Sequence, residues 1–461
     1  MSLHLPLLLA YSVLLVALGL WMGRRVRRAG DFFVAGRQLG PGLLFATMLA
    51  ANLGAGSTVG AAGLGYRDGA GAWWWVGSAG LGSLVLAFAV GPRIWREASA
   101  HGFHTVGDYL ERRFSPAVKG LIAGLLWLGT LAILAGQLIA LAWLLQVVAG
   151  LPKVVGCLVG GLVMTTYFVA GGLLTSAWVN LVQLVVLLGG FAIALTGTLG
   201  AVGGWDGLAA RLATVPPDYL AFWRGGQSGW PYLLLLGPAF IVSPGLLQKV
   251  YGARDARAVR LGVGANAAAL LVFAAVPPLL GMIARGLHPG LPNHELALPA
   301  LLTYDLPPLV GSIGLAALFS AEVSTADAIL FMLATSLSQD LYRGFVNRQA
   351  TDAQLLRAAR SAAVAGAALG VALAVVSPSI IDTLKVFYTL LGVCLFVPIL
   401  GGLFVPRLDT AGALAGILAG VAATAAAQWG AAGAWAGALG PVAAGLATSV
   451  TAAAVVSLRP R

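Results

Sequence analysis

The sequence predicts an all-α polytopic membrane protein, and three observations point to this fold class. Hydrophobic residues make up 59% of the 461 residues and charged residues only 9%, whereas a soluble domain carries about 25% charged residues. Apolar runs of the roughly 20 residues that a helix needs to cross a bilayer recur about 13 times. Lys and Arg gather in the short segments between these runs, as they do where positive charge fixes the orientation of membrane helices.

The apolar runs define the expected membrane spans in order along the chain. Short polar or basic segments separate each run from the next. The expected spans are Leu3–Gly23, Pro41–Gly65, Gly69–Arg93, Lys119–Gly150, Lys153–Gly171, Leu173–Gly200, Trp230–Leu247, Leu261–Ala284, Leu309–Gln339, Ala358–Ser377, Ile381–Val405, Ala411–Gly430 and Gly437–Leu458. We interpret the first as a retained helix rather than a secretory leader, because basic residues follow it instead of preceding it.

The distribution of Lys and Arg predicts how the chain is oriented. If the N-terminus lies outside, the inner segments contain all but six of the 27 Lys and Arg residues. The six exceptions are Arg67, Lys153, Arg211, Arg224, Arg285 and Lys385. This bias predicts an outer N-terminus and an inner C-terminus in the cytoplasmic membrane. The net charge of +11 therefore reflects topology, and no nucleic-acid partner is expected.

Two consecutive sets of five spans are expected to have opposite topology. The set within 41–200 starts on the inner side of the membrane and ends on the outer side. The set within 230–405 starts on the outer side and ends on the inner side. One extra helix (3–23) precedes these sets and two helices (411–458) follow them, so residues 1–461 are expected to form a single transmembrane domain. The first span of each set is interrupted, at Ala50–Gly60 and at Gly237–Gly245. Interrupted spans at matching places in two inverted halves indicate a binding site of a transporter.

The stretch Ala50–Gly60 is the more unusual of the two interruptions. It contains three glycines, an Asn, a Ser and a Thr in the middle of an apolar span. Glycine favours departure from helical geometry. A helix that unwinds at membrane depth exposes carbonyl groups that lipid cannot satisfy, so we expect an ion and a solute to meet them.

The ninth span offers a partner for these carbonyl groups. Ala321, Ser324, Thr325 and Ala328 follow the i, i+3, i+4, i+7 spacing and share one helix face. Sodium is a hard cation that takes about five or six oxygen ligands, and two hydroxyls with the freed carbonyls suit it. The alternative is that both hydroxyls only make hydrogen bonds within or between helices.

Two acidic residues of the same span, Glu322 and Asp327, also lie at membrane depth. A carboxylate there costs about 3 kcal/mol or more, so each is expected to face the bundle or an aqueous cavity. Either can carry a proton, lie near a cation or make a structural hydrogen bond. They flank the Ser324 and Thr325 face on opposite sides, so both cannot contact one ion from this helix.

Other polar residues at depth are either candidates for the site or hydrogen-bonding contacts between helices. They are Asn52, Ser57, Thr58, Gln137 and Asn180. Trp73–Trp75 are expected to belong to the aromatic belt at the membrane surface. No basic residue is expected deep in a core span. All five histidines lie in loops or at the N-terminus, so no metal-dependent enzyme is expected.

Several short segments, in this order, resemble those of the sodium:solute symporter family. They are Asp31–Arg37, Thr105–Phe114, Tyr167–Leu173, Gln248-Lys249 with the basic loop to Arg260, and Val323–Asp327 followed by Asp340-Leu341-Tyr342. The resemblance covers the chain from about residue 31 to about residue 405. It implies the leucine-transporter-like inverted-repeat fold, with one helix before the core and two after it, as a single transport domain.

The resemblance also implies which residues form the sites. The expected sodium ligands are the carbonyls of Ala50, Leu53 and Ala321 and the hydroxyls of Ser324 and Thr325. The expected substrate-binding residues are Ser57, Asn52, Gln137 and Phe240. No cofactor is implied, because sodium is a co-transported ion.

One departure from the family pattern concerns the ion. The family's T-D-x-x-Q segment reads Val179-Asn180-Leu181-Val182-Gln183 here, so an amide replaces an acidic residue that helps many members to handle sodium. Three explanations follow from this departure: weaker binding of sodium, compensation by Glu322 or Asp327, or replacement of sodium by protons. The three alternatives stay open at this point.

The sequence therefore predicts a secondary active symporter that couples inward sodium flow to uptake of a small organic solute by alternating access. The expected partners are that solute, sodium and the lipid bilayer. One alternative is a proton-coupled symporter that uses Glu322 or Asp327, with Asn180 as a further residue involved in coupling. A second alternative is a membrane solute sensor, and an enzyme is not expected.

Overall fold

Helices form almost the whole computed structural model, which describes residues 4–23, 37–169, 173–429 and 440–458. Its α-helices are α1 His4–Gly23, α3 Pro41–Asn52, α4 Ala61–Asp68, α5 Trp73–Val85, α6 Gly91–His101, α7 Val106–Arg113, α8 Pro116–Ala149, α9 Lys153–Val169, α10 Leu173–Ala201, α11 Gly204–Arg211, α12 Tyr232–Val242, α13 Pro244–Tyr251, α14 Ala256–Phe273, α15 Val276–Leu287, α16 Ala297–Tyr304, α17 Pro308–Thr335, α18 Asp352–Val376, α19 Ile380–Phe396, α20 Gly402–Phe404, α21 Thr410–Trp429 and α22 Gly440–Ser457. A two-stranded antiparallel sheet, β1 Arg224–Gly225 and β2 Ser228–Gly229, pairs Arg224 with Gly229 and Gly225 with Ser228.

Short helical segments of other types continue several of these helices. The π-helical segments are Gly56–Gly60, Leu86–Val90, Ser336–Val346 and Val397–Gly401, and the 3₁₀ segments are Gly69–Ala72, Pro217–Leu220 and His294–Leu296. The segment Asp31–Gly36 and the predicted span ends Leu3, Gly171, Gly430 and Gly437 lie outside the described residues.

Ten helical stretches in the described part of the chain are long and apolar enough to cross a membrane. Three shorter apolar helices accompany them, at His4–Leu15, Pro41–Asn52 and Lys153–Thr166. The longest apolar stretch, Gly56–His101, joins the end of the second predicted span to the third, because helical turns continue across Gly69–Ala72. The predicted number of about 13 spans therefore stays a prediction.

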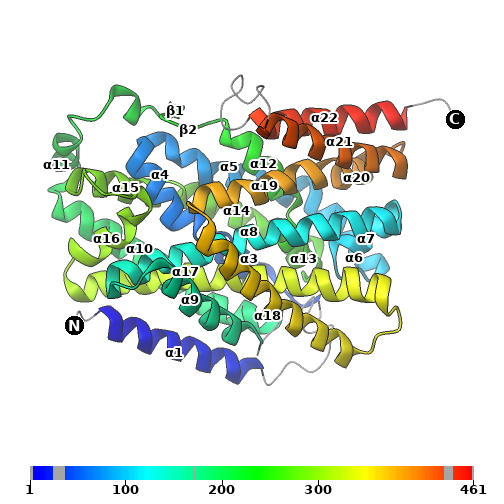
Figure 1. The fold of residues 1–461 in the computed structure, drawn as a ribbon, viewed down its shortest axis with the longest axis horizontal. Helices are drawn as coiled ribbons and strands as arrows, with labels where there is room; N and C mark the ends of the chain where they lie inside the picture. The colour runs from blue at the N-terminus through cyan, green and yellow to red at the C-terminus, as the bar shows by residue number, and fades with distance from the viewer. Residues whose placement is uncertain (1–3, 24–36, 170–172, 430–439, 459–461) are drawn as a thin grey trace.

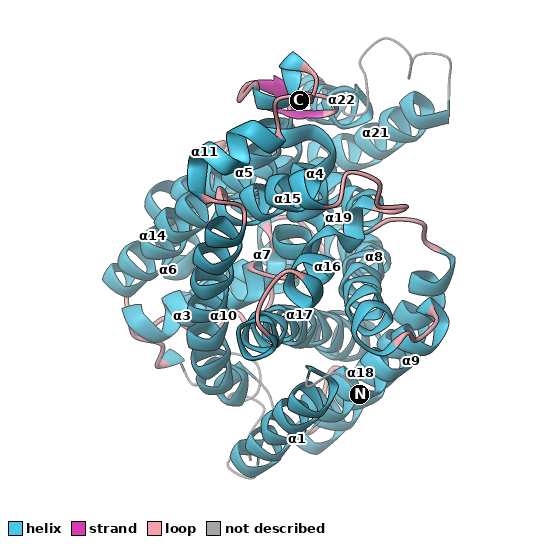
Figure 2. Cartoon of the chain, turned by 90° about the vertical axis from the view of Figure 1, so that its left-hand side faces the viewer, coloured by secondary structure: helices cyan, strands magenta, loops and turns pink. Residues whose placement is uncertain are grey.

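The long helices run roughly along the longest axis of the molecule (Figure 1). The short helices α11, α15 and α16 gather at one end of the bundle, and α6, α7 and α20 gather at the other. Figures 1 and 2 place α1 on one flank and the α21–α22 pair on the opposite flank. The helices predicted to lie outside the two repeats are thus peripheral.

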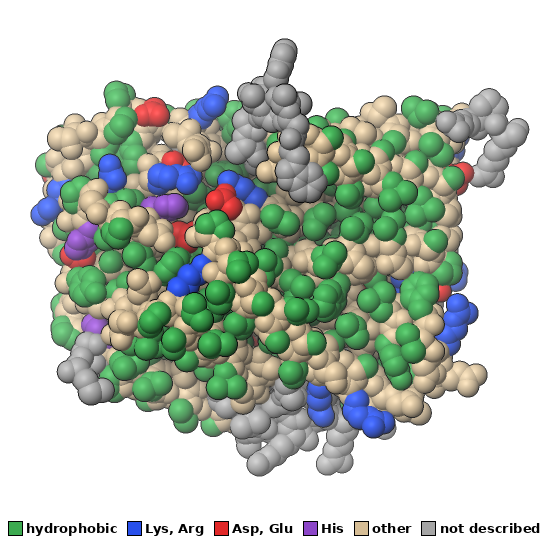
Figure 3. Space-filling view, viewed as in Figure 1, with side chains coloured by type: hydrophobic (Ala, Val, Ile, Leu, Met, Phe, Trp, Pro, Cys, Tyr) green, Lys and Arg blue, Asp and Glu red, His purple; other side chains and the backbone are tan. Residues whose placement is uncertain are grey.

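The surface of the bundle is apolar between its two ends. Figure 3 shows a broad band of hydrophobic side chains, with most charged side chains nearer the ends of the visible face. Large apolar side chains such as Leu162, Val185 and Val272 are 70%, 68% and 74% exposed. A soluble protein does not leave so much apolar surface in water, so this band is the face that meets lipid.

Helix α17 lies at the centre of the bundle. It packs against α10, α8, α3 and α18, and almost all of its residues from Gly311 to Thr335 are buried. The peripheral helix α1 is attached to it by hydrogen bonds between His4 and Ser312 (2.8 Å) and between Tyr11 and Ser320 (2.5 Å). The hydroxyl face predicted on this helix is therefore inside the protein and not exposed to lipid.

The structure confirms that the second predicted span is interrupted. Helix α3 ends at Asn52, and Leu53 leaves the helical conformation with φ −95° and ψ 67°. The chain resumes as the π-helical segment Gly56–Gly60 and then as α4. The break occurs at the Gly-rich position, as glycine's conformational freedom predicts.

The seventh predicted span is interrupted as well, but here a proline rather than a glycine-rich stretch ends the helix. Helix α12 ends at Val242, and Ser243 (φ −54°, ψ 121°) turns the chain into α13, which starts at Pro244. Proline has no backbone N–H and disfavours helical geometry in the residue before it. Its ring also suits the first position of a helix, so this break is set by Pro244.

Candidate functional site

The hydroxyl groups of α17 meet the first break in α3. Ser324 Oγ donates a hydrogen bond to the Ala50 carbonyl at 2.9 Å, and Thr325 Oγ1 lies 3.1 Å from the same oxygen. Ser324 Oγ also lies 3.2 Å from the Ala321 carbonyl. Four of the five predicted sodium ligands are thus in mutual contact.

The break leaves backbone carbonyls without their usual partners. In an unbroken helix the N–H of residue i+4 would donate to each carbonyl. Among the described residues, no backbone N–H donates to the carbonyl of Ala50 or Leu53. Leu53, the fifth predicted ligand, is fully buried and lies at the break itself. Buried carbonyls of this kind require a polar partner.

Gln137 of α8 supports the other side of the break. Its Oε1 accepts a hydrogen bond from the Ala55 N–H at 2.8 Å, which replaces the lost helical acceptor. An added Cβ at Gly54 would lie 2.5 Å from both Gln137 Oε1 and Thr325 Oγ1. Gly54 thus allows α8 and α17 to approach the backbone this closely.

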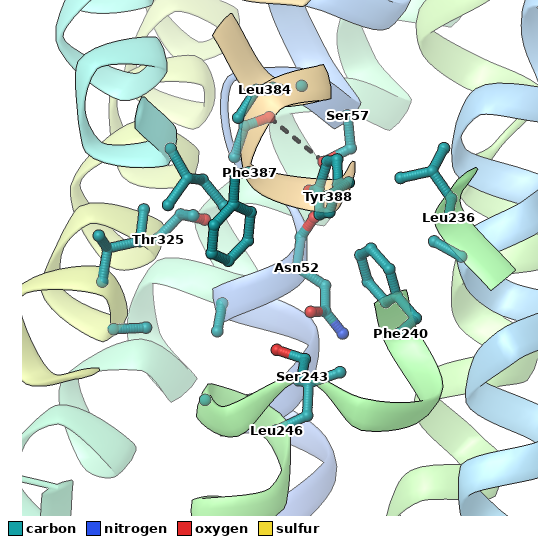
Figure 4. Close-up of a pocket in the computed structure, with 18 of the residues that line it drawn as sticks. Asn52, Ser57, Leu236, Phe240, Ser243, Leu246, Thr325, Leu384, Phe387 and Tyr388 are labelled. Atoms are coloured by element: carbon teal, nitrogen blue, oxygen red, sulfur yellow. Dashed lines mark hydrogen bonds between the residues drawn. The ribbon is translucent and has the colours of Figure 1, made fainter. Parts of the chain in front are cut away.

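A cavity lies beside the break. All four predicted substrate-binding residues, Asn52, Ser57, Gln137 and Phe240, line it, and so does Thr325 from the sodium set. Figure 4 shows the rings of Phe240 and Tyr388 near its centre, with ring centroids 5.7 Å apart. The ion and solute residues predicted from the sequence therefore border one space.

The polar residues of this cavity already have partners in the protein. The Ser57 hydroxyl donates to the Asn52 carbonyl at 2.7 Å, so its oxygen remains available as an acceptor. Asn52 Nδ2 donates to Asn266 Oδ1 of α14 at 3.0 Å. Asn266, which the sequence prediction missed, is fully buried and holds the Asn52 amide in place.

Several aromatic residues of the cavity were also missed or misassigned. Trp75 was expected in the aromatic belt with its neighbours, and that expectation is wrong. It is 2% exposed, lines the cavity, and packs edge-to-face on Tyr232 (5.0 Å) and Tyr388 (6.0 Å). Trp74 is 7% exposed and contacts Phe222 beside the β1–β2 sheet. No periodic pattern could separate these two tryptophans from a belt.

One basic residue near the end of a core span is buried in the protein, which the sequence analysis did not foresee. The predicted span ended at Leu247, but α13 continues to Tyr251. Lys249 is consequently 2% exposed and lines the cavity. The polar pair Gln248-Lys249 looks like a span end in the sequence, and only packing places it inside.

The three predicted coupling residues fall in different environments. Glu322 is fully buried, and its Oε1 lies 2.9 Å from the Thr58 hydroxyl. Asp327 is 4% exposed and interacts electrostatically with the Lys249 ammonium. Asn180 is fully buried on α10, which packs along α17. Glu322 and Asp327 thus do contact different partners, as their angular separation predicted.

Comparison with known proteins identifies similar sequences. A model of the sodium:solute symporter family matches residues 32–420. The chain is similar to a sodium/pantothenate symporter of Escherichia coli (strain K12), with 28% identity over 73% of this chain and 71% of the relative. It is also similar to a sodium/glucose cotransporter of Vibrio parahaemolyticus, with 25% identity over 77% of this chain and 71% of the relative. A high-affinity proline transporter of Bacillus subtilis (strain 168) is 25% identical over 87% of both chains.

Solved structures with a similar fold are also known. A Na+-coupled sialic acid symporter in a substrate-bound outward-open state gives a TM-score of 0.84 at 19% identity, covering 98% of this chain and 97% of that chain. A transporter of the nucleobase-cation-symport-1 family gives a TM-score of 0.63 at 14% identity, covering 94% of both chains. The predicted fold class is therefore confirmed. The matching family and relatives are transporters rather than enzymes, which confirms that expectation too.

Proposed function

Since the chain belongs to the sodium:solute symporter family, we propose that it is a secondary active transporter in which inward sodium flow drives uptake of a small organic solute. The proposed transport domain comprises the whole chain, with inverted repeats at 41–200 and 230–405, in the cytoplasmic membrane with the N-terminus outside. Helices 3–23 and 411–458 are the proposed additions to this core. The observation that carries the proposal is the contact of two α17 hydroxyls with a carbonyl freed by the break in α3.

Sodium binds, in this proposal, between α3 and α17. The donor set of Ala50, Leu53, Ala321, Ser324 and Thr325 consists entirely of oxygen atoms, which is the chemistry that a hard cation requires. The hydroxyl protons that now point at the Ala50 carbonyl must rotate away when a cation enters. The ion then replaces these hydrogen bonds as the link across the break.

The solute binds next to the ion, on the same broken segment. Asn52 and Ser57 flank Leu53, so any shift of the break on ion binding reaches the solute cavity directly. Sodium that fixes the break in one arrangement removes an ordering cost from solute binding. The linkage is reciprocal, so each ligand tightens binding of the other by the same factor. Rocking of the α3–α4 and α12–α13 segments then exposes the cavity to the other side of the membrane.

Transport into proteoliposomes tests the sodium coupling. Uptake from a mixture of labelled candidate solutes is compared at fixed pH with sodium or choline as the outside cation. We expect uptake above empty liposomes only with sodium, and collapse of the sodium gradient should abolish accumulation. Equal uptake in choline would contradict sodium coupling.

A second candidate function, proton-coupled symport, is favoured by the contact between Thr58 and Glu322. Thr58 Oγ1 lies 2.9 Å from both the Gly54 carbonyl and Glu322 Oε1. A hydroxyl has one proton to donate, so both contacts are full hydrogen bonds only when Glu322 carries a proton. Glu322 Oε2 has no hydrogen-bond partner among the described residues, which also suits a neutral acid.

The variant Glu322→Gln separates the two candidates, because glutamine can still donate to Thr58 but cannot release a proton. Sodium-coupled transport should survive this change, whereas proton-coupled transport should stop. Asp327→Asn, which changes the other acid of α17, is the matched comparison. Uptake driven by a pH gradient without sodium, lost only in Glu322→Gln, would establish the proton-coupled alternative.

A further inference from the structure

The segment between α11 and α12 exposes a cluster of large apolar side chains near the end of the bundle that carries α11, α15 and α16. This segment contains the β1–β2 hairpin. The cluster consists of Leu220 (57% exposed), Phe222 (42%), Trp223 (65%) and Trp230 (48%). So much aromatic and aliphatic surface on a short segment is unfavourable in water. The exposure therefore indicates that these side chains meet an apolar partner.

Hydrogen bonds fix this segment against α4. The Tyr219 hydroxyl donates to the Gly65 carbonyl (2.7 Å), and the Ser228 hydroxyl donates to the carboxylate of the buried residue Asp68 (2.6 Å). Tyr219 and Ser228 are themselves buried, at 5% and 1% exposure. The exposed side chains are therefore presented from a firmly attached part of the protein.

The same segment covers a tryptophan of α5 that the sequence placed in the aromatic belt. Trp74 Nε1 donates a hydrogen bond to the Phe222 carbonyl (3.0 Å). The Trp74 ring packs against the rings of Phe222 and Trp223, with centroids 5.6 Å and 5.3 Å away. Trp74 is consequently buried, whereas Trp223 is exposed on top of it. The place that a belt residue would take beside α5 is thus occupied by the segment between α11 and α12.

The position of the hairpin in the fold indicates what its exposed face meets. Figure 1 shows the hairpin on the same flank as α22, displaced toward the end that carries α11. Figure 2, which looks along the long helices, shows both strands at the rim of the bundle and not over its centre. Figure 3 shows charged and histidine side chains gathered toward the same end of the visible face. The hairpin therefore lies at the side of the bundle, near the level at which the apolar band gives way to polar surface.

The chemistry of the segment matches lipid headgroups at this level. Tryptophan is enriched where a membrane meets water, because its ring is apolar and its N–H group can stay hydrated. Arg224, which lies between the exposed aromatic residues in the sequence, is exposed as well. A guanidinium group binds phosphate oxygens well, but it is costly to bury without a partner. A bilayer surface satisfies the rings and the arginine together.

We propose that residues 217–230 form an interfacial anchor, which inserts its four exposed apolar side chains into the headgroup region of the lipid leaflet at this end of the bundle. The partner of this surface is the bilayer itself. None of the four side chains is among the described residues that line the cavity. The anchor therefore connects α4 and α5 to the membrane surface and is separate from the proposed ion and solute sites.

Fluorescence labelling of the full-length protein in lipid nanodiscs tests the depth of this segment. The free cysteines Cys157 and Cys394 are both buried, so a thiol-reactive bimane label reports on one introduced cysteine. The test site is Leu220→Cys. Leu162→Cys in the lipid-facing band is the apolar reference. Gly290→Cys is the aqueous reference, because Gly290 is exposed in a loop and an added Cβ there meets nothing within 4 Å.

Three quenchers then distinguish the possible environments of the label. Lipids brominated high on the acyl chain quench near the headgroups, lipids brominated near the chain end quench deep in the bilayer, and iodide quenches from water. We expect the largest loss of fluorescence with the shallow bromines at Leu220, with the deep bromines at Leu162 and with iodide at Gly290. A label at Leu220 that only iodide quenches would overturn the proposal. A label there that none of the three quenches would also overturn it, since a second copy of the chain or another protein would then cover the segment.

Two variants without any introduced cysteine repeat the test on the native side chains. Trp223→Phe and Trp230→Phe keep an apolar ring but remove one fluorophore, so each should reduce the quenching of tryptophan fluorescence by shallow-brominated lipid. Trp75→Phe is the matched control, because Trp75 is buried inside the protein, and it should not reduce this quenching. Quenching that stays at the wild-type level in both Trp223→Phe and Trp230→Phe would overturn the proposal.

Discussion

The two helix breaks occupy corresponding places in the inverted repeats but differ in chemistry. The first, at Leu53–Ala55, lies in a glycine-rich stretch, and side chains of α8 and α17 approach its backbone. The second, at Ser243, is made by proline, and its neighbour α13 begins at the cavity wall. The first break presents carbonyl oxygens and the second presents the start of a helix. The first therefore suits a cation, whereas at the second break the Ser243 carbonyl already accepts hydrogen bonds from the Leu246 and Leu247 N–H groups.

This difference indicates how a symmetric fold can hold two unlike ligands. Both breaks border the same cavity, and α19 packs against the π-helical segment of the first and against α12 of the second. Small residues and hydroxyl groups surround the first break, and a lysine and aromatic residues lie near the second. If the ion binds at the first break and the solute near the second, a change at one break should have little effect on binding of the other break's ligand.

The largest expected effect comes from Gly54→Ala at the first break. The new Cβ would lie 2.5 Å from Gln137 Oε1 and from Thr325 Oγ1, so one of these side chains must move out of place. We expect the sodium concentration for half-maximal stabilisation to rise about 100-fold, as measured by melting temperature in sodium titrations with choline balance.

The matched control for this change is Gly42→Ala in α3, the helix that precedes the break. An added Cβ at Gly42 meets nothing within 4 Å, and alanine favours the helix by about 1 kcal/mol. Its sodium titration should overlay that of the wild-type protein. If Gly54→Ala behaves in the same way, the close approach at the first break does not matter for the ion.

The next largest effect is expected for Ser324→Ala. The variant removes one proposed sodium ligand and the hydrogen bond to the Ala50 carbonyl, and it leaves the second hydroxyl in place. We expect sodium affinity to fall about 30-fold, within the usual value of a hydrogen bond to a charged group. Isothermal titration or the same melting assay can measure this change.

Thr335→Ala provides the comparison on the same helix, because that buried hydroxyl donates to the Phe331 carbonyl of its own helix (2.6 Å). Its loss should leave sodium affinity unchanged. Equal losses of sodium affinity in both variants would mean that α17 hydroxyls act through helix stability and not as ligands.

The first break was predictable from the sequence because its cause is local. Three glycines with hydroxyl and amide neighbours stand out in an apolar span, and the spacing of Ser324 and Thr325 places both on one face. The second break was visible as Ser243-Pro244-Gly245, but its cavity was not. Lys249 and Trp75 become buried through packing of α13 and α5 with other helices, and no periodicity in the sequence encodes those contacts. The Asn52–Asn266 pair, 214 residues apart, was hidden for the same reason.

A smaller and more local effect is expected for Pro244→Ala at the second break. Alanine supplies a backbone N–H and removes the restriction on Ser243, so the helix can close partly across the break. We expect hydrogen exchange of the amides between Phe240 and Leu247 to slow about fivefold, while sodium affinity changes less than about twofold. Mass spectrometry of peptides from this segment measures the exchange.

Pro308→Ala is the control, since Pro308 is exposed and also occupies the first position of its helix, α17. It should leave exchange between Phe240 and Leu247 unchanged. A Pro244→Ala protein whose sodium affinity falls as far as that of Ser324→Ala would break the comparison, because the second break would then also serve the ion.

The smallest expected effect concerns Glu295, which supports the helix shared by both breaks. Its Oε1 accepts a hydrogen bond from the Ile380 N–H at the start of α19 (2.7 Å), and its Oε2 accepts one from Trp143 Nε1 (2.9 Å). Glu295→Gln can keep only one of these two hydrogen bonds, because an amide has one acceptor oxygen and its N–H₂ group cannot accept. The variant should lose about 1 kcal/mol of stability at low pH, with sodium affinity unaltered.

The same residue predicts a pH dependence with a definite sign. Burial raises the pKa of the Glu295 carboxyl above its ordinary value, which is about 4.3 in an unfolded chain. The unfolded chain therefore releases this proton at lower pH than the folded protein does. Stability that Glu295 contributes is complete below about pH 4 and falls as the pH rises towards the raised folded pKa. The wild-type melting temperature should thus decline relative to that of Glu295→Gln over this interval, and a constant difference between the two curves would show that α19 is held without titration of this carboxyl.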